Sequence, residues 1–271
     1  PGPGLAGGGA SMTNTITNSV KSYVSGAEMV KTTSGITLSS TDGITTTTDV
    51  GSGAGGFGAI GGSVGVSLAS IDNTTNTTAY IDSAVNISDG GIVVQSVSSV
   101  HGDALAVATS VAGGAGAGSG AGGDASTKAS GTVLSYLGPN AVIDVSGNIV
   151  VAASSTASSK AESYGIAGSI GGFAGAVGVS LATATSTVAT RTYHQGAINK
   201  AKNVTFDSSN SSTSESITFA LAAGISLIPG AALVGAGSDS TSMTSPEVSS
   251  RVEGGTIGTV ANRIDGNVVI R

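Results

Sequence analysis

Four tyrosines recur along the chain at a nearly constant interval. Tyr23, Tyr80, Tyr136 and Tyr193 are separated by 57, 56 and 57 residues, and the sequence around them recurs with them. Self-similarity at a fixed period of about fifty residues is the signature of a repeat architecture. We therefore expect stacked copies of one unit, and stacked strand repeats build elongated rods more often than active sites.

The internal order of the repeat is the same each time. After each tyrosine come a turn, a β-branched run, a Ser/Thr stretch and a Gly/Ala box. The β-branched runs are 35–38, 91–94, 148–151, 203–206 and 267–270. The Gly/Ala boxes are 51–69, 107–123, 165–182 and 219–237. In the last copy we expect Val252 to take the place of the tyrosine.

The best internal match has the same spacing. Residues 64–69 and 177–182 both read Val-Gly-Val-Ser-Leu-Ala, 113 residues apart, which is two periods of 56.5. Because this offset agrees with the independently measured tyrosine interval, the repeat is established from the sequence.

Composition narrows the class of protein. The 271 residues include 44 Gly, no Cys and no Trp, and only 10% are charged, against about 25% in ordinary globular chains. The apolar content is mostly Ala, Val and Ile, which suits thin, close-packed sheets. A net charge of −6 disfavours nucleic acid and anionic membranes as partners. The absence of Cys excludes disulfide scaffolds and thiolate metal sites and fits a long extracellular protein that crosses an envelope unfolded.

The local patterns predict strands throughout. Residues 77–82 and 141–145 alternate with a period of two and are rich in β-branched side chains. Turn signals are dense, at 41–43, 88–91, 138–140, 146–148 and 265–267. Helix formers are scarce. The fold class is therefore all-β.

A parallel, right-handed β-helix or β-solenoid of about four and a half repeats of roughly 56 residues fits these patterns best. We expect residues 12–271 to form this single domain, as a fragment of a longer protein, and residues 1–11 to be a linker or cloning-derived. Two coil sizes stay open: three coils of roughly 18–20 residues per repeat, or one wide, flattened coil whose Gly/Ala boxes form two closely spaced sheets. A β-propeller is the less suitable alternative, since the boxes do not read as four short strands.

The Gly/Ala boxes require a reason, because Gly weakens a strand. We expect tight packing of two sheets, so that Gly178→Leu would cost several kcal/mol through overpacking. The box 219–237 has 19 uncharged residues, close to the length that spans a bilayer. It aligns with three less apolar boxes and is interrupted by Pro229 and Gly230. We therefore expect no membrane insertion.

No catalytic, cofactor-binding or metal site is predicted. His101 and His194 are 93 residues apart at inequivalent positions, so both are expected to be surface histidines. Asp42, Asp89 and Asp265 each precede Gly, which turn chemistry explains. Neither the close carboxylate pair of glycoside hydrolases nor tandem calcium-binding repeats occur, and no Lys-Ser/Thr follows the Gly-rich runs as a phosphate loop requires. Five glycosylation sequons, at Asn73, Asn76, Asn86, Asn203 and Asn210, are near the number expected by chance.

The tyrosine period, the Ile-Val-Val runs and the Val-Gly-Val-Ser-Leu-Ala boxes at 64–69 and 177–182 resemble repeats of very large bacterial surface proteins. These are filamentous adhesins of the filamentous-haemagglutinin and leukotoxin-like kind, and related autotransporter passengers. The resemblance covers nearly the whole chain from Ser11 on. It implies right-handed β-helical stalks that are secreted across an outer membrane and displayed on the cell, with a role in adhesion and virulence and no catalytic residues to transfer.

These observations together predict a non-catalytic stalk segment of a bacterial cell-surface adhesin, extracellular and attached to the outer membrane. Backbone ladders would bear load while the Ser/Thr faces stay hydrated. A host or neighbouring-cell receptor or glycan would be bound by other parts of the parent protein, and self-association is left open. The alternatives are a carbohydrate-active β-helix enzyme, which needs acids within about 6 Å of one another, and a polysaccharide- or ice-binding module, for which residues 45–48 are an isolated Thr run.

Overall fold

The chain folds into long parallel strands with a short sheet at one end. The computed structural model describes residues 2–229, 231–259 and 263–271, and in these residues it contains strands and no helix. The long strands are β1 (Gly4–Ser25), β3 (Ile36–Phe57), β4 (Ile60–Asp82), β6 (Ile92–Leu137), β8 (Ile149–His194), β10 (Val204–Ser226) and β11 (Ala232–Thr244). The short strands are β2 (Val30–Thr32), β5 (Ala84–Ile87), β7 (Val142–Val145), β9 (Ala197–Lys200), β12 (Glu247–Val252), β13 (Thr256–Ile257) and β14 (Val268–Ile270).

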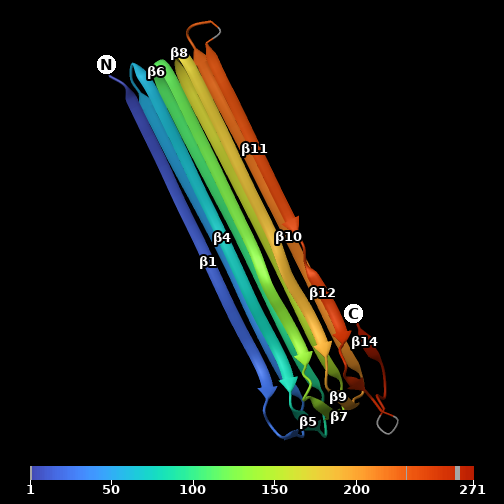
Figure 1. Ribbon diagram of the computed structural model, residues 1–271. Helices are drawn as coiled ribbons and strands as arrows, with labels where there is room; N and C mark the ends of the chain where they lie inside the picture. The colour runs from blue at the N-terminus through green and yellow to red at the C-terminus, as the bar shows by residue number, and fades with distance from the viewer. Residues whose placement is uncertain (1, 230, 260–262) are drawn as a thin grey trace.

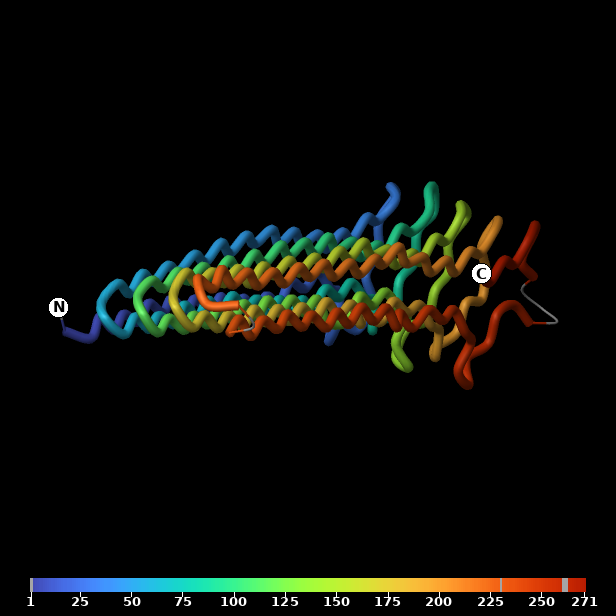
Figure 2. The backbone as a smooth tube through the Cα atoms, turned by 90° about the horizontal axis from the view of Figure 1, so that it is seen from above, coloured from blue at the N-terminus to red at the C-terminus, as the bar shows by residue number. Residues whose placement is uncertain are grey.

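Each repeat makes one wide, flattened coil. A forward strand such as β3 runs to a turn at residues 58–59, β4 returns beside it, and β5 crosses the far end before β6 starts the next coil. In β6 and β8 the forward and return halves are one continuous strand of 46 residues that bends at this turn. The tube in Figure 2 shows the two layers and the bends that join them. We call the two layers the forward layer and the return layer, and the two ends the hairpin end and the cap end.

Successive coils pair in parallel and in register. Tyr23 pairs with Tyr80, Tyr80 with Tyr136, and Tyr136 with Tyr193. The β-branched runs pair in the same way at the start of the forward layer, and the short strands β13, β9, β7, β5 and β2 form their own parallel sheet at the cap end (Figure 1). The expected all-β parallel solenoid is confirmed. Of the two coil sizes left open by the sequence, the structure has the single wide coil.

Two details differ from the sequence-based expectations. Residues 4–11, expected to be a linker, lie within β1 and pair with residues 61–68 of β4. Their Gly and Ala residues suit the same closely packed layer as the other Gly/Ala boxes. At the other end, Arg251 and not Val252 lies opposite Tyr193, and Val252 pairs with His194. Because side chains alternate along a strand, this difference of one residue places the valine on the inward side.

The interior changes character from one end of the coil to the other. At the cap end, hydrophobic side chains from the forward strands, the return strands and the short strands form the largest hydrophobic cluster, which includes Ile81, Ile87, Leu137 and Phe206. Towards the hairpin end the clusters are smaller and consist mainly of alanine. The two layers therefore enclose a thick core at one end and a thin one at the other.

Inward-facing glycines mark where the layers approach each other. A Cβ atom added to Gly165 would lie 2.2 Å from the carbonyl oxygen of Val179, and one added to Gly65 would lie 2.3 Å from that of Thr109. At Gly178 the corresponding distance to the Leu221 oxygen is 2.6 Å. In each case the oxygen belongs to the opposite layer. These distances support close packing of the two layers as the reason for the inward-facing glycines of the boxes.

Inward-facing hydroxyl groups join the two layers. Ser67 Oγ donates to the carbonyl oxygen of Val50 at 2.7 Å, and Ser135 Oγ donates to that of Ala152 at 2.6 Å. Both serines are fully buried. The Ser/Thr stretches are thus hydrated only on their outward half, while their inward half forms polar contacts across a narrow interior.

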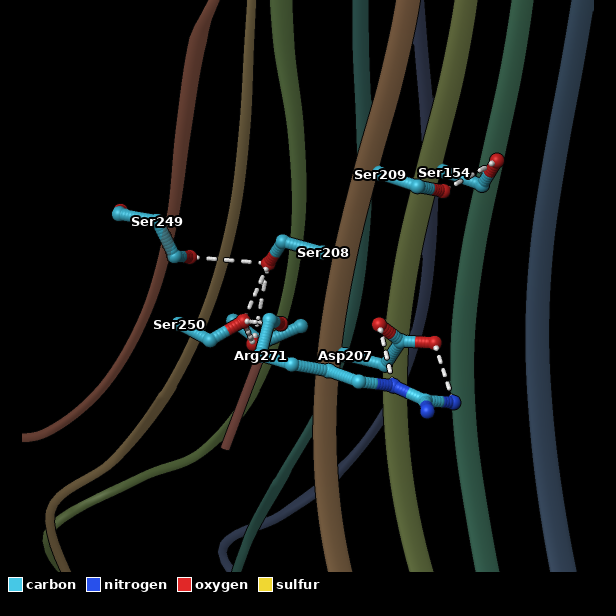
Figure 3. A network of polar contacts seen from close by, with 8 residues as sticks. Ser154, Asp207, Ser208, Ser209, Ser249, Ser250 and Arg271 are labelled. Atoms are coloured by element: carbon cyan, nitrogen blue, oxygen red, sulfur yellow. Dashed lines mark hydrogen bonds and ion pairs between the residues drawn. The ribbon is translucent and has the colours of Figure 1, made fainter. Parts of the chain in front are cut away.

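The last coil is held at the cap end by a polar network around the C-terminus (Figure 3). The Arg271 guanidinium donates to both carboxylate oxygens of Asp207, at 3.2 and 3.4 Å. Ser250 Oγ donates to the Arg271 carbonyl oxygen at 2.6 Å, and Ser208 Oγ donates to the Ser249 carbonyl oxygen at 2.9 Å. These contacts connect β10 of the forward layer, β12 of the return layer and the residue after β14.

Candidate interaction surface

Several ion pairs join neighbouring coils. Lys128 contacts Asp72 at 3.5 Å, and Arg191 contacts Glu247; the partners in each pair are 56 residues apart. These pairs are largely exposed, so each contributes little to stability. In the part of the chain that the structure describes, no three His, Cys, Asp or Glu side chains are grouped so as to hold a metal ion.

One column of alternating charge crosses the forward layer. Asp103, Lys160 and Glu215 are paired in register on three successive coils, and Lys160 also forms an ion pair with Glu162. The hydrogen bond to Glu162 is the main cause that raises the pKa of Lys160, with smaller effects from Asp103 and Glu215. In this column the lysine separates the two acids of the neighbouring coils.

The two histidines have different environments. His101 is exposed on β6, as expected. The expectation of a surface site is wrong for His194, which is fully buried. It follows the outward-facing Tyr193, so the alternation of the strand turns its ring inward. Its Nε2 lies 3.1 Å from the Thr256 carbonyl oxygen, and burial lowers the pKa of the imidazole.

The three Asp residues expected in turns lie in two different environments. Asp89 and Asp265 lie in bends outside the strands. Asp42 instead lies inside β3 and is buried, which corrects the turn assignment. Asn18 Nδ2 donates to one of its carboxylate oxygens at 2.7 Å and Thr75 Oγ1 donates to the other. The sequence Thr-Asp-Gly resembles a turn, but these inward partners let the carboxylate occupy the interior of a long strand.

Among the sequon asparagines, Asn73 is fully buried. Its Nδ2 donates to the His101 carbonyl oxygen at 3.2 Å, and its Oδ1 accepts from Thr46 Oγ1 at 3.1 Å. Thr46 and Thr48 are themselves buried, so the run 45–48 presents only alternate residues to solvent. A sugar could not be accommodated at Asn73 in the folded chain.

The ladder tyrosines stack face to face. Their ring centroids are 5.1, 4.8 and 4.6 Å apart between successive coils, with interplanar angles of 12° or less. Burial and the neighbouring phenols raise the pKa of Tyr136 to about 12. Because each internal ring is covered on both faces by its neighbours, the ladder presents ring edges to solvent and not the faces on which sugars stack.

The most apolar exposed surface lies at the hairpin end. Val64 and Val177 are 55% and 53% exposed, and Phe57 and Phe173 are 70% and 62% exposed. A groove of about 610 Å³ runs across the return layer here and is lined by Leu5, Gly62, Val64, Gly118, Gly175, Val177 and their neighbours. In residues 64–69 and 177–182 the valines and the leucine point outward while the Gly, Ser and Ala residues point inward, which reverses the usual amphipathic pattern.

The sequence does not predict this surface. Residues 64–69 and 177–182 carry its alternation of large and small residues, but alternation alone does not fix which side of a strand faces solvent. Comparison of the chain with family models, curated proteins and solved structures finds no match. No helix in the described residues is long and apolar enough to cross a membrane.

Proposed function

We propose that this chain is a non-catalytic structural segment of a bacterial cell-surface adhesin, in which stacked coils form a rigid body that displays adhesive parts of the parent protein. The observation that supports this most is the in-register continuation of the same rows of residues from coil to coil. Such a stack has no geometric limit to its number of coils, because each coil offers the next one the same pairing edge.

The dimensions of the coil refine this proposal. Each coil adds about 4.8 Å along the stack, the spacing of hydrogen-bonded strands. A forward strand of 22 residues such as β3 spans roughly 70 Å at about 3.3 Å per residue. One repeat therefore contributes a third of the height that three small coils would give, and a much wider face. The segment is better suited to a broad, blade-like part of a surface fibre than to a thin stalk.

Mechanical strength follows from the same geometry. A coil can separate from its neighbour only when two long backbone ladders and the interior hydroxyl contacts break together, and each backbone hydrogen bond contributes about 0.5–1.5 kcal/mol net. Load along the stack is therefore distributed over many bonds in parallel. A carbohydrate-active enzyme or a polysaccharide-binding module remains the alternative, and release of reducing sugar from bacterial or plant glycans would support the enzyme.

The location can be tested on intact cells that produce the parent protein. Antibodies raised against this chain should label the outer surface in immunogold micrographs, and mild external protease should remove the label. An antibody against a cytoplasmic protein serves as the control and should label only permeabilised cells. If antibodies against this chain also require permeabilised cells, the surface proposal is wrong.

A further inference from the structure

In two rows of the outer face of the return layer, large and small residues alternate from coil to coil. The adjacent row differs, with Leu5 and Leu233 on the two outer strands and glycine at the three positions between them. At the hairpin end, β4 presents Val64, Val66 and Leu68, and β8 presents the matching Val177, Val179 and Leu181, all 39–55% exposed. The strands on either side, β1, β6 and β11, carry glycine in the valine rows. We call β4 and β8 the ridge strands and β1, β6 and β11 the groove strands. Two coils, or about 9.6 Å, separate the ridges.

The interior of the monomer does not account for the glycines of the groove. Cβ atoms added at Gly116, Gly118, Gly120 and Gly122 of β6 would meet nothing within 4 Å, and none of these residues has a positive φ. This contrasts with the inward glycines, where an added Cβ meets backbone of the opposite layer. Glycine weakens a strand and often marks the close approach of another backbone. The exposed valines and leucines of the ridges form a contiguous apolar surface, which typically marks an interface.

We infer that this face binds the same face of a second copy of the chain, ridges into grooves. A two-fold axis parallel to the long strands keeps the two hairpin ends together and reverses the order of the coils. With this axis, β4 of one copy faces β6 of the other, and β8 faces β1 of the other. Each ridge strand of one copy then faces a groove strand of the other, and the same holds with the two copies exchanged, as in an isologous interface. The arrangement is the dry interdigitation of facing sheets.

The size and chemistry of the face fit a dimer. With this axis four strands of each copy overlap, because β11 faces no strand of the other copy. At about 4.8 Å per strand and about 3.3 Å for each of nine residues, they cover roughly 570 Å² per copy, the size of a small, weakly associating interface. Charged residues occur only in the last row of this face, where Asp124 and Asp239 flank Leu181. This row lies at the rim of the interface, so both carboxylates can stay hydrated. A lipid bilayer would need neither the alternation nor the glycine grooves. The inference is independent of the proposed cell-surface role.

The forward layer provides a natural comparison. Its outer row at the same end reads Gly51, Val107, Tyr164 and Phe219 across the four coils. In this row the residues become larger along the stack and do not alternate. Two rows nearer the turn are mixed: Gly55, Val111, Gly168 and Ala223 alternate only in part, as do Phe57, Gly113, Ile170 and Ile225. Only in the return layer do two neighbouring rows repeat the same alternation over five strands, so the inferred interface is placed there.

Filling the groove tests the inference. In sedimentation equilibrium, the full chain should form a monomer–dimer system, and the double variant Gly120→Val/Gly122→Val should dimerise at least tenfold more weakly. Its circular dichroism and melting temperature should not fall, because the space above both residues is open. Gly43→Val is the matched control. Gly43 lies in the forward layer, a Cβ there also meets nothing within 4 Å, and this variant should dimerise like the wild type.

Removal of the ridges gives a second, independent variant. Val64→Gly/Val177→Gly should also abolish the dimer, since both residues are exposed in the monomer. The inference is overturned if the wild-type chain stays monomeric at millimolar concentration, if the groove-filled variant dimerises as well as wild type, or if association gives an open series of polymers through the strand edges. Binding of monomeric wild-type chain to phosphatidylcholine vesicles, retained in the groove-filled variant, would identify lipid as the occupant instead.

Discussion

Replacing a single inward glycine should separate the two layers. In Gly178→Leu, the first added carbon would lie 2.6 Å from the Leu221 carbonyl oxygen and 3.0 Å from that of Gly165, where ordinary contacts begin at 3.4 Å. Both oxygens belong to backbone that is held in the sheet ladder, so neither can move alone. Three further side-chain carbons must then enter the thinnest part of the interior, where the residues paired along this row are Ala121 and Ala236.

The expected cost follows from these distances. Overpacking of a well-packed core costs about 1–3 kcal/mol when a neighbour can adjust. Here the obstacle is backbone on the opposite layer, so we expect a loss of roughly 3 kcal/mol or more, in the range that marks severe core disruption. Gly168→Leu is the matched control. Gly168 lies on the same strand, but its added Cβ meets nothing within 4 Å, so this variant should remain within about 0.5 kcal/mol of wild type.

Guanidinium denaturation followed by far-ultraviolet circular dichroism measures the difference between the two variants. Because a stacked repeat protein can open locally, hydrogen exchange should be measured in parallel on peptides covering 165–182 and 219–226. The Gly178 variant should lose protection in both. If Gly178→Leu costs less than about 1 kcal/mol, or if Gly168→Leu costs as much, close approach of the layers is not the reason for the inward glycines.

Three further results should follow from the interior and the ladder. Titration of Tyr136, followed by tyrosinate absorbance, should show a pKa of about 12. Because this folded value exceeds the ordinary 10, the free energy of unfolding should be at its full value below pH 10 and fall above it, by about 1 kcal/mol after solvent screening. Burial lowers the pKa of His194 from 6.5, so the unfolding free energy should fall as pH drops below about 6.5, and His194→Leu should flatten this dependence. Ser180→Ala removes a buried 2.5 Å hydrogen bond to the Ser163 carbonyl oxygen and should cost about 1 kcal/mol in denaturant melts. Ser169→Ala, whose buried hydroxyl has no partner among the described residues, should cost nothing; equal losses for both would refute the role of the cross-layer bond.

Much of the fold could be predicted because one period fixes many pairings at once. Equal spacing of Tyr23, Tyr80, Tyr136 and Tyr193 implies that equivalent residues lie side by side in a parallel sheet, and in the structure each of these tyrosines pairs with the next. The coil size could not be predicted in the same way. It depends on where the chain reverses, and a box with many glycines offers many equivalent places for a turn.

The direction of side chains was harder to predict than their pairing. In residues 64–69 the valines and the leucine face solvent and the glycine and serine face inward, which reverses the usual assumption that apolar residues are buried. His194 was misplaced for a related reason. Its neighbour Tyr193 faces outward, but the sequence gives no sign of which side of the strand the tyrosines occupy. Both errors have the same cause. A period of two fixes which residues share a face of the strand, but it does not fix which face points to solvent.

The stacking of the tyrosines tests the whole architecture most directly. Solid-state NMR recoupling on chain labelled with ring-¹³C tyrosine, in a Tyr164→Phe background that leaves only the ladder, measures the distance between equivalent rings. One wide coil per repeat predicts a spacing of 4.6–5.1 Å. A spacing of about 14 Å, as three small coils per repeat would give, or no detectable coupling, would contradict the flattened solenoid and the proposals that depend on it.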